Sequence, residues 1–283
     1  MIEIKKILYK LKNLLLKYYQ FLFCRKIFQP INNIIYDFAL VGKGIGGSTD
    51  ISKNGEGRFL KSLSFLYNEK SFIVFDIGAN VGEYSSEILQ LFSKCYIYAF
   101  EPNPKSFILL SKKFNHLNNV MLYNLGLGSI KTTTKLYDYK EEEGSTHASI
   151  YKSMFESFYG NKETISYEIE IITLDDFLEK ENIQSVDLLK IDIEGGELEV
   201  LKGAKKSINE NRIKIIQFEF NYTHICSRVF LKDFFDLLAN YDLYRVILDG
   251  LCKLKYDAKD EIFMFQNIIA INKLYKDLFN KII

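Results

Sequence analysis

The chain has 283 residues, of which 48% are hydrophobic and 26% are charged, and its formal net charge is +1. This composition is typical of a folded globular protein with one large α/β domain or two small ones. Seven Lys or Arg residues against one Glu give residues 1–30 a charge of +6, which leaves −5 on the rest of the chain. Because binding to a phosphate backbone needs a basic stripe, the acidic body excludes nucleic acid from the expected substrates.

The cysteines predict neither a disulfide framework nor a zinc site. They are Cys24, Cys95, Cys226 and Cys252. They lie far apart, without a CxxC motif or the Cys/His spacing of metal ligands. A reducing compartment suits such a chain, so we expect a cytoplasmic protein.

The first residues carry an apolar stripe at helical spacing, with lysines between its members. Its members are Ile4, Ile7, Leu8, Leu11, Leu14, Leu15, Tyr18 and Leu22. The segment has no run of about eighteen apolar residues and no small-residue cleavage site, which disfavours a transmembrane span and a signal peptide. We expect an amphipathic helix that packs on the domain or on a second copy of the chain. The alternative is a peripheral helix on an anionic membrane surface.

The sequence predicts an extension over residues 1–55 and a catalytic domain over residues 56–275. A short amphipathic helix is expected at Arg58–Tyr67. Strand-like runs then alternate with helical segments, which is typical of βαβ units in a parallel sheet with helices on both faces. The expected strands are Phe72–Phe75, Tyr96–Phe100, Val120–Tyr123, Leu188–Ile191, Ile213–Phe220, Leu243–Leu248 and Phe263–Ile271. The expected helices are Tyr84–Phe92, Lys105–Phe114, Gly196–Lys206 and Val229–Asn240.

Residues 131–172 interrupt this alternation with two stretches of period-two pattern and a polar segment between them. The simplest interpretation is a β-hairpin lobe inserted between the third and fourth parallel strands. Loops at that edge of a sheet commonly form a wall of the active site.

Two glycine-rich segments compete as the nucleotide-binding loop. The first, Gly42–Gly47, satisfies the GxGxxG pattern, and Ile35–Val41 could form the strand before it. The dinucleotide motif also needs a helix after the loop and an acidic residue about twenty residues later. Ser48–Glu56 is a poor helix, and no strand ends in an acid at that distance. We therefore expect a plain loop, with an NAD-type oxidoreductase as the alternative.

The second segment, DIGANVG, runs from Asp76 to Gly82 and has the context that the first lacks. An apolar strand leads into it and a helix-forming segment leaves it. Gly78 permits a tight turn, and Gly82 allows close packing at the start of the helix. Asp76 places a carboxylate at the end of the strand, where it would repel a phosphate. Together with Asn80, these residues are candidates for cofactor binding.

The next two strands end in residues suited to a nucleoside. Glu101 follows the second strand, where a carboxylate can accept two hydrogen bonds from a ribose diol. Asn124 begins NLGLG after the third strand, a segment that could border an adenine through backbone contacts. The pattern predicts an adenosine ligand with a free diol and no phosphate.

With these motifs the sequence resembles the FkbM family of S-adenosylmethionine-dependent methyltransferases. The matching stretches are FDIGANVGEYS, YAFEPNP, TLDDF, LLKIDIEGGELEVLKGA and FEFNYTHICSRVFLKDFFDLL, which lie between residues 75 and 238. The resemblance implies a Rossmann-like class I fold with a mostly parallel seven-stranded sheet, and S-adenosylmethionine as the cofactor. It also implies O-methylation of a hydroxyl on a sugar, a glycan or a secondary metabolite.

The resemblance places Asp192 and Glu194 beside the methyl donor and acceptor. Glu219 ends the following strand in the same way, and His147 lies in the inserted lobe. These four residues are the catalytic candidates, because loss of a hydroxyl proton needs a nearby base. Structural alternatives remain open: Glu219 could be a buried anchor, His147 could be incidental, and Glu197 could be a carboxylate at a helix N-terminus. The sequence does not decide whether a metal is needed.

A third reading is a non-catalytic scaffold at the membrane surface with a degenerate nucleotide fold. The motif residues are intact, which argues against it. They are Asp76, Gly78, Gly82, Glu101 and Asp192.

Overall fold

The computed structural model describes residues 2–68, 70–140, 144, 147–158, 163–280 and 282. The chain divides into two compact units, Met1–Gly46 and Gly47–Ile283. The domain limits expected from the sequence, at residues 55 and 275, stay a prediction.

The first unit is helical, and it consists of α1 (Ile2–Phe23), η1 (Lys26–Phe28) and α2 (Gln29–Gly42). The side chain of Asn32 joins the two helices, because it accepts from the Tyr19 hydroxyl at 2.7 Å and donates to the Phe23 carbonyl at 3.1 Å. The strand considered at Ile35–Val41 is wrong, since these residues lie in α2. Pro30, in the first turn of α2, favours a helix start there. Among the described helices, none is long and apolar enough to cross a membrane.

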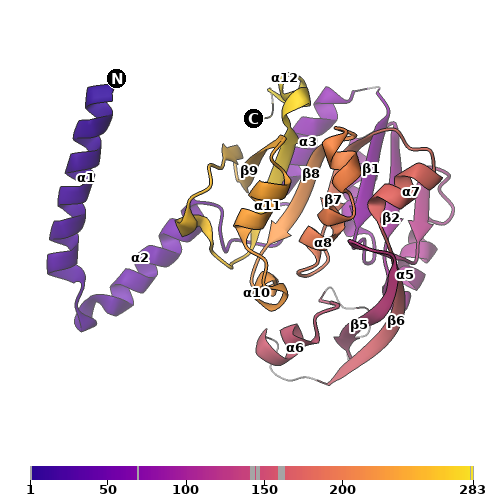
Figure 1. Cartoon of the computed structure of the whole chain (residues 1–283), viewed down its shortest axis with the longest axis horizontal. Helices are drawn as coiled ribbons and strands as arrows, with labels where there is room; N and C mark the ends of the chain where they lie inside the picture. Colours follow the sequence, from indigo (N-terminus) through magenta and orange to yellow (C-terminus); the bar gives the residue numbers. More distant parts are fainter. Residues whose placement is uncertain are drawn as a thin grey trace. The chain divides into compact units, whose positions relative to one another are not determined.

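The second unit contains an eight-stranded sheet with the order β10-β9-β11-β8-β7-β1-β2-β3 (Figure 1). The strands are β1 (Phe72–Ile77), β2 (Cys95–Phe100), β3 (Val120–Tyr123), β7 (Val186–Ile191), β8 (Ile213–Phe220), β9 (Tyr241–Ile247), β10 (Gly250–Lys253) and β11 (Gln266–Asn272). The expected mostly parallel sheet of the class I methyltransferase fold is confirmed. Its seven expected strands are present, and β10 adds an eighth at one edge through a hairpin with β9. Strand β11 lies between β8 and β9 and is antiparallel to both.

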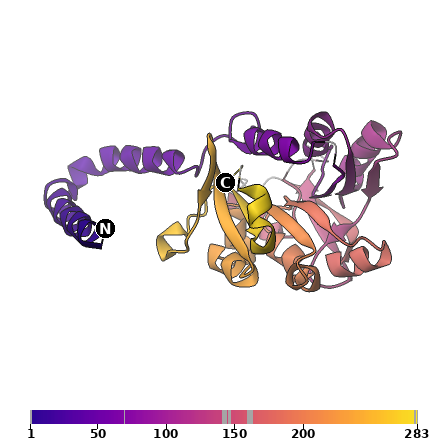
Figure 2. The same cartoon turned by 90° about the horizontal axis from the view of Figure 1, so that it is seen from above.

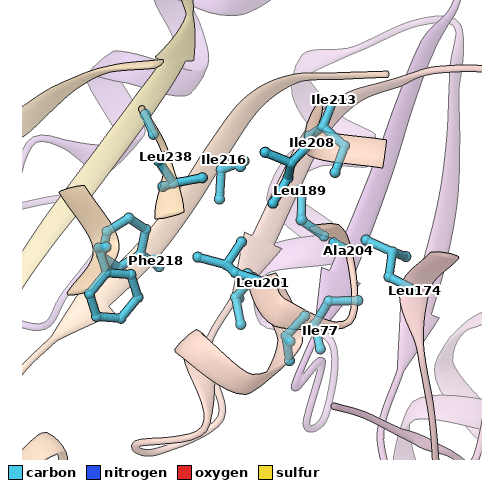
Figure 3. Close-up of a cluster of buried hydrophobic side chains, with 14 of the residues drawn as sticks. Ile77, Leu174, Leu189, Leu201, Ala204, Ile208, Ile213, Ile216, Phe218 and Leu238 are labelled. Carbon is cyan, nitrogen blue, oxygen red and sulfur yellow. The ribbon is translucent and has the colours of Figure 1, made fainter. Parts of the chain in front are cut away.

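Helices cover both faces of the sheet, as predicted (Figure 2). One hydrophobic cluster combines the sheet with α3 (Glu56–Leu66), α4 (Glu83–Leu91) and α5 (Pro104–Phe114). The other combines it with α7 (Leu174–Lys180), α8 (Glu197–Lys202), α9 (Lys205–Asn209) and α11 (Leu231–Leu237). Figure 3 shows the second cluster, in which Leu189 and Ile216 of the sheet meet Leu201 and Ile208 of the helices. Burial on both faces explains why β1 reads as a nearly continuous apolar run.

The helix expected at Gly196–Lys206 is two short helices, α8 and α9, with a break at Gly203. A Cβ at Gly203 would lie 2.0 Å from the Gly128 carbonyl oxygen, so the chain approaches a distant loop there too closely for a side chain. The remaining helical segments are α10 (Thr223–Ser227), η2 (Ala258–Asp260), η3 (Lys273–Tyr275) and α12 (Lys276–Phe279).

The predicted insertion is a small lobe with its own three-stranded sheet, in the order β4-β6-β5. Strand β5 (Thr132–Tyr139) pairs antiparallel with β6 (Thr164–Ile172), while β4 (Gly126–Leu127) pairs parallel with β6. Helix α6 (Lys152–Phe158) lies between β5 and β6 in the sequence. Figure 1 shows the lobe below the main sheet. Part of the polar stretch before His147, residues 141–143, 145 and 146, lies outside the described residues.

Replacing Gly82 with Ala should destabilise the fold by more than about 1 kcal/mol. Gly82 has a φ of +78°, and a Cβ there would lie 2.2 Å from the Phe114 ring. Gly42→Ala is the control, because nothing lies within 4 Å of its Cβ position and its backbone has no positive φ. Urea unfolding of both variants measures the difference, and equal stabilities would contradict the packing role of Gly82.

Candidate active site

A cleft of about 940 Å³ opens at the carboxyl ends of β1, β2, β7 and β8. Ligands of open α/β sheets bind at this edge. The lobe provides one wall through side chains of β5 and β6, among them Leu136 and Ile169. All the described lining residues belong to the second unit.

The loop after β1 approaches the end of β7 so closely that it needs glycine. Gly78 has a φ of +81°, and a Cβ there would lie 1.9 Å from the Asp192 carbonyl oxygen. The Asp192 backbone N–H donates to the Ile77 carbonyl at 2.9 Å and continues the strand pairing to this point. Gly78 and Asn80 line the cleft, whereas Gly82 instead packs α4 against α5.

Asp76 is not among the residues that line the cleft. Its carboxylate is buried and accepts from the Ser85 hydroxyl at 2.6 Å. Burial raises the pKa of Asp76 above its usual value. In this structure Asp76 joins the end of β1 to the start of α4.

Glu101 lines the cleft with a carboxylate that the backbone holds in place. Its two oxygens accept from the N–H groups of Asn80 and Asn103, each at 2.7 Å. Burial raises the pKa of Glu101 to about 7, although these amides oppose the shift. The Asn124 amide does not line the cleft; it donates to the carbonyls of Glu101 and Pro102 at 2.8 and 3.2 Å. Asn124 therefore fixes the loop that carries Glu101.

A buried lysine, which the sequence reading missed, organises the other end of the cleft. Lys190 on β7 donates to the Asp192 carboxylate at 2.8 Å, and its ammonium lies 5.3 Å from the centre of the Tyr84 ring. Burial alone would lower the pKa of Lys190, but three nearby carboxylates outweigh it and raise the pKa above its usual value. They belong to Asp192, Glu56 and Glu219.

Glu56 was also missed, because it lies at the start of α3, far from the motifs in sequence. Its carboxylate is buried and accepts from the side chains of Asn54 and Gln217. The Tyr84 hydroxyl donates to the same Gln217 side chain at 2.9 Å. A lysine within a fully buried strand was the available signal, because a buried charge requires partners.

Glu219 lies in the same part of the cleft, at the end of β8. Burial, reinforced by the charge of Asp192, raises the pKa of Glu219 well above its usual value. The Asn221 amide donates to it at 3.2 Å, and both residues line the cleft. The raised pKa favours the protonated form of this carboxyl, which donates as well as accepts a hydrogen bond.

The lobe meets the end of β7 at Glu194, which has a φ of +54°. One carboxylate oxygen lies 3.5 Å from His147 Nδ1, while the other is buried without a hydrogen-bond partner among the described residues. The Ser149 hydroxyl donates to the Glu194 backbone carbonyl at 2.9 Å. Burial raises the pKa of Glu194. The structure thus brings three of the predicted catalytic carboxylates and His147 to one cleft.

Glu197 and His224 support this loop from behind and do not line the cleft. Glu197 accepts from the N–H groups of Ile193 and Gly195 at 3.1 and 3.3 Å, and lies 3.1 Å from His224 Nε2. Burial opposes ionisation of Glu197, but His224 and the backbone amides outweigh it and lower the pKa. Nδ1 of His224 accepts from the Asn221 N–H at 3.3 Å.

The comparisons with known proteins settle the family. The model of the methyltransferase FkbM domain matches residues 76–246. The chain belongs to the FkbM methyltransferase family. This is a family of S-adenosylmethionine-dependent methyltransferases, in agreement with the resemblance seen in the sequence. The NAD alternative fails structurally as well, because a helix ends at Gly42 where the dinucleotide motif needs a strand.

Three relatives illustrate the range of the family. Methyltransferase 1 of Beauveria bassiana (strain ARSEF 2860) is 30% identical, and the match covers 48% of this chain and 59% of that protein. The 2-O-methyltransferase NoeI of Sinorhizobium fredii (strain NBRC 101917 / NGR234) is 23% identical, with 65% and 77% covered. The hexuronic acid methyltransferase AglP of Haloferax volcanii is 26% identical, with 53% and 56% covered. The chain thus spans less than two thirds of the Beauveria and Haloferax proteins.

The cleft fits the cofactor of this family. Gly78, Asn80 and Glu101 line it together, and the Glu101 carboxylate is held by two backbone N–H groups where the sequence predicts the ribose diol. Lys190 is the only Lys or Arg among the described lining residues, and it is engaged with Asp192, so no cation is placed for a pyrophosphate. Within the described part of the chain, no group of three or more His, Cys, Asp or Glu is arranged to hold a metal ion.

The affinity for S-adenosylhomocysteine should rise with pH between about 5.5 and 8. Only ionised Glu101 accepts both diol hydrogen bonds well, and its pKa is raised to about 7, so affinity should fall up to about tenfold per pH unit below that value. The contribution of this carboxyl to the free energy of unfolding changes in the opposite direction. It decreases as pH rises from the ordinary pKa of 4.5 through 7, because the folded state binds the proton more tightly than the unfolded state does. Calorimetric titration at several pH values measures the affinity. Glu101→Gln should bind more weakly and without this dependence; an unchanged pH profile in that variant would contradict the assignment.

Proposed function

We propose that the protein transfers a methyl group from S-adenosylmethionine to a hydroxyl of a neutral sugar or a similar polyol. The observation that carries this proposal is the position of Asp192, Glu194 and Glu219 in the same cleft as Glu101. Glu101 would hold the ribose of the cofactor, and the three carboxylates would surround the acceptor hydroxyl. Two relatives support the class of acceptor, since one is named for 2-O-methylation and the other for hexuronic acid.

The reaction joins the methyl carbon to the acceptor oxygen, breaks its bond to sulfur and releases the hydroxyl proton. The bound cofactor supplies an electrophilic methyl group. The chain has to align the hydroxyl and take up its proton, and such a base typically contributes a factor of about 10²–10⁴. Asp192 is our choice for the base, because its carboxylate faces the cleft and the Lys190 ammonium at 2.8 Å fixes its position. His147, beside Glu194, is the second candidate.

The remaining carboxyls would orient the acceptor. With its raised pKa, Glu219 can donate a hydrogen bond to a sugar oxygen, while the Asn221 amide beside it can both donate and accept. Glu194 also lines the cleft, where its carboxyl would accept from a hydroxyl of the acceptor. A polyol provides several hydroxyls at the spacing that such a cluster needs.

The charge of the cleft favours a neutral acceptor over an acidic one. Nine Asp or Glu residues line it within the described part of the chain, against Lys190 and His147. A carboxylate on the acceptor would meet like charges in a partly buried site, which costs binding energy. A substrate of this chain therefore differs in charge from a hexuronic acid.

Asp192→Asn should lower turnover at least about a hundredfold while cofactor affinity changes little, because the amide has nearly the same shape and is not a base. Glu199→Gln is the matched control, since Glu199 also lines the cleft but pairs with Lys202 at 2.6 Å. Turnover is measured with a methyl glycoside as the acceptor, and cofactor affinity is measured by calorimetric binding of S-adenosylhomocysteine. Near-normal turnover of Asp192→Asn would move the role of base to His147.

Methyl transfer should favour a methyl hexopyranoside over the matching uronate by at least about tenfold in kcat/KM, because the two differ only at C6, where a neutral hydroxymethyl group replaces a carboxylate. A panel of such matched pairs, read by the mass increase of the product, tests the preference. Faster methylation of the uronates would contradict the proposal that the acceptor is neutral. Absence of methylation in every pair would contradict the proposal that the acceptor is a sugar.

A further inference from the structure

The first helix exposes an apolar face that is not explained by the catalytic function. Six of its side chains are each between 49% and 64% exposed. They are Ile7, Leu8, Leu11, Leu14, Leu15 and Tyr18. At 100° per residue they fall on one side of α1, and a continuous exposed stripe of this size marks an interaction surface. We call it the α1 face.

Lysines flank the α1 face on both of its sides. Lys6, Lys10 and Lys17 are exposed and lie within roughly 40° of one another around the helix axis. Lys12 borders the α1 face, and residues 1–30 carry +6 in total. An apolar helix face flanked by lysines suits the interface of an anionic bilayer, where long lysine side chains reach the headgroups.

The second helix extends this surface. Ile31, Ile34 and Phe38 of α2 are 52%, 53% and 75% exposed, and α2 contains a single charged residue, Asp37. The bonds of Asn32 to Tyr19 and Phe23 fix the turn between the helices. The unit therefore has exposed apolar side chains on both helices and positive charge concentrated on α1.

The positive charge of α1 favours an anionic lipid surface over a second copy of the chain as the binding partner. A second copy would bring a helix of the same strong positive charge against α1, and like charges across an interface are unfavourable. The flanks of a self-pairing helix usually alternate in sign, whereas Glu3 is the one acidic residue of residues 1–30. An anionic lipid surface complements the lysines and accepts the apolar side chains at once.

We propose that residues 1–42 bind the surface of an anionic lipid bilayer and attach the methyltransferase to it. Each lysine near such a surface contributes about 1 kcal/mol, or roughly fivefold in partition. The apolar face contributes by burial in the interface, so binding needs both features. The proposal does not depend on the identity of the acceptor.

Co-sedimentation of the full chain with vesicles tests it. The protein should bind vesicles of phosphatidylcholine with about one third phosphatidylglycerol at low salt, bind vesicles of phosphatidylcholine alone at least tenfold more weakly, and lose most of its binding near 1 M salt, where charges are screened beyond about 3 Å. Binding of S-adenosylhomocysteine should be unchanged, which keeps this test separate from that of the methyl acceptor.

Two variants and one control make the test specific. Neutralising α1 with Lys6→Gln, Lys10→Gln, Lys12→Gln and Lys17→Gln should weaken binding at least a hundredfold, and removing apolar side chains with Leu8→Gln, Leu11→Gln and Leu15→Gln should do the same. The control carries the same charge change on exposed lysines of the other unit. It combines Lys112→Gln, Lys180→Gln, Lys255→Gln and Lys259→Gln, and it should bind as the unmodified chain does.

Equal binding to both kinds of vesicle, equal loss in the control, or no binding at all would overturn the proposal. Light scattering tests whether a second copy of the chain occupies the α1 face instead. A dimer that the leucine variant dissociates, without vesicle binding by the original chain, would assign the α1 face to a second copy instead.

Discussion

The charge of one buried lysine holds the acceptor end of the cleft together. Lys190 lies on β7 between Asp76 of β1 and Gln217 of β8 in the strand register, so the three side chains share one face of the sheet. Its ammonium faces the carboxylates of Asp192, Glu56 and Glu219, which would otherwise be buried together with like charges. Breaking such a group by removing one partner is strongly unfavourable, whereas the intact group fixes positions. The carboxylates that we propose for catalysis therefore occupy defined places before any ligand arrives.

Around Glu101 and Glu197 the loops are held in another way, because these carboxylates accept hydrogen bonds from backbone amides. Glu101 binds the N–H groups of two loops, and Glu197 binds two N–H groups of the loop that carries Glu194. These bonds satisfy amides at the ends of strands, where regular pairing has stopped. They also couple loops that follow different strands, so that the sheet edge becomes one rigid surface. Buried and prepositioned polar groups of this kind are what differential binding of a transition state needs.

Charge is divided between the two units of the chain. The cleft is acidic, which suits a cationic cofactor and a neutral acceptor, while α1 is basic, which suits an anionic surface. A bilayer attracted by the α1 lysines would repel the acidic body of the enzyme. The same distribution would therefore hold the protein at the membrane while leaving the cleft in water.

The sequence by itself determined the α/β class, the glycine loop at Gly78 and the place of Glu101, because each depends on a local pattern: alternating strands and helices, or a residue directly after a strand. Family motifs added Asp192 and Glu194. Only the tertiary structure decided that Lys190 pairs with Asp192 within the electrostatic reach of Glu56, that Asn124 holds a loop instead of lining the cleft, and that β11 inserts between β8 and β9. These features join residues far apart in the chain, and strand order and side-chain direction are set by packing across the whole sheet. A local pattern shows that a buried charge needs a partner, but only the tertiary structure determines which residue that partner is.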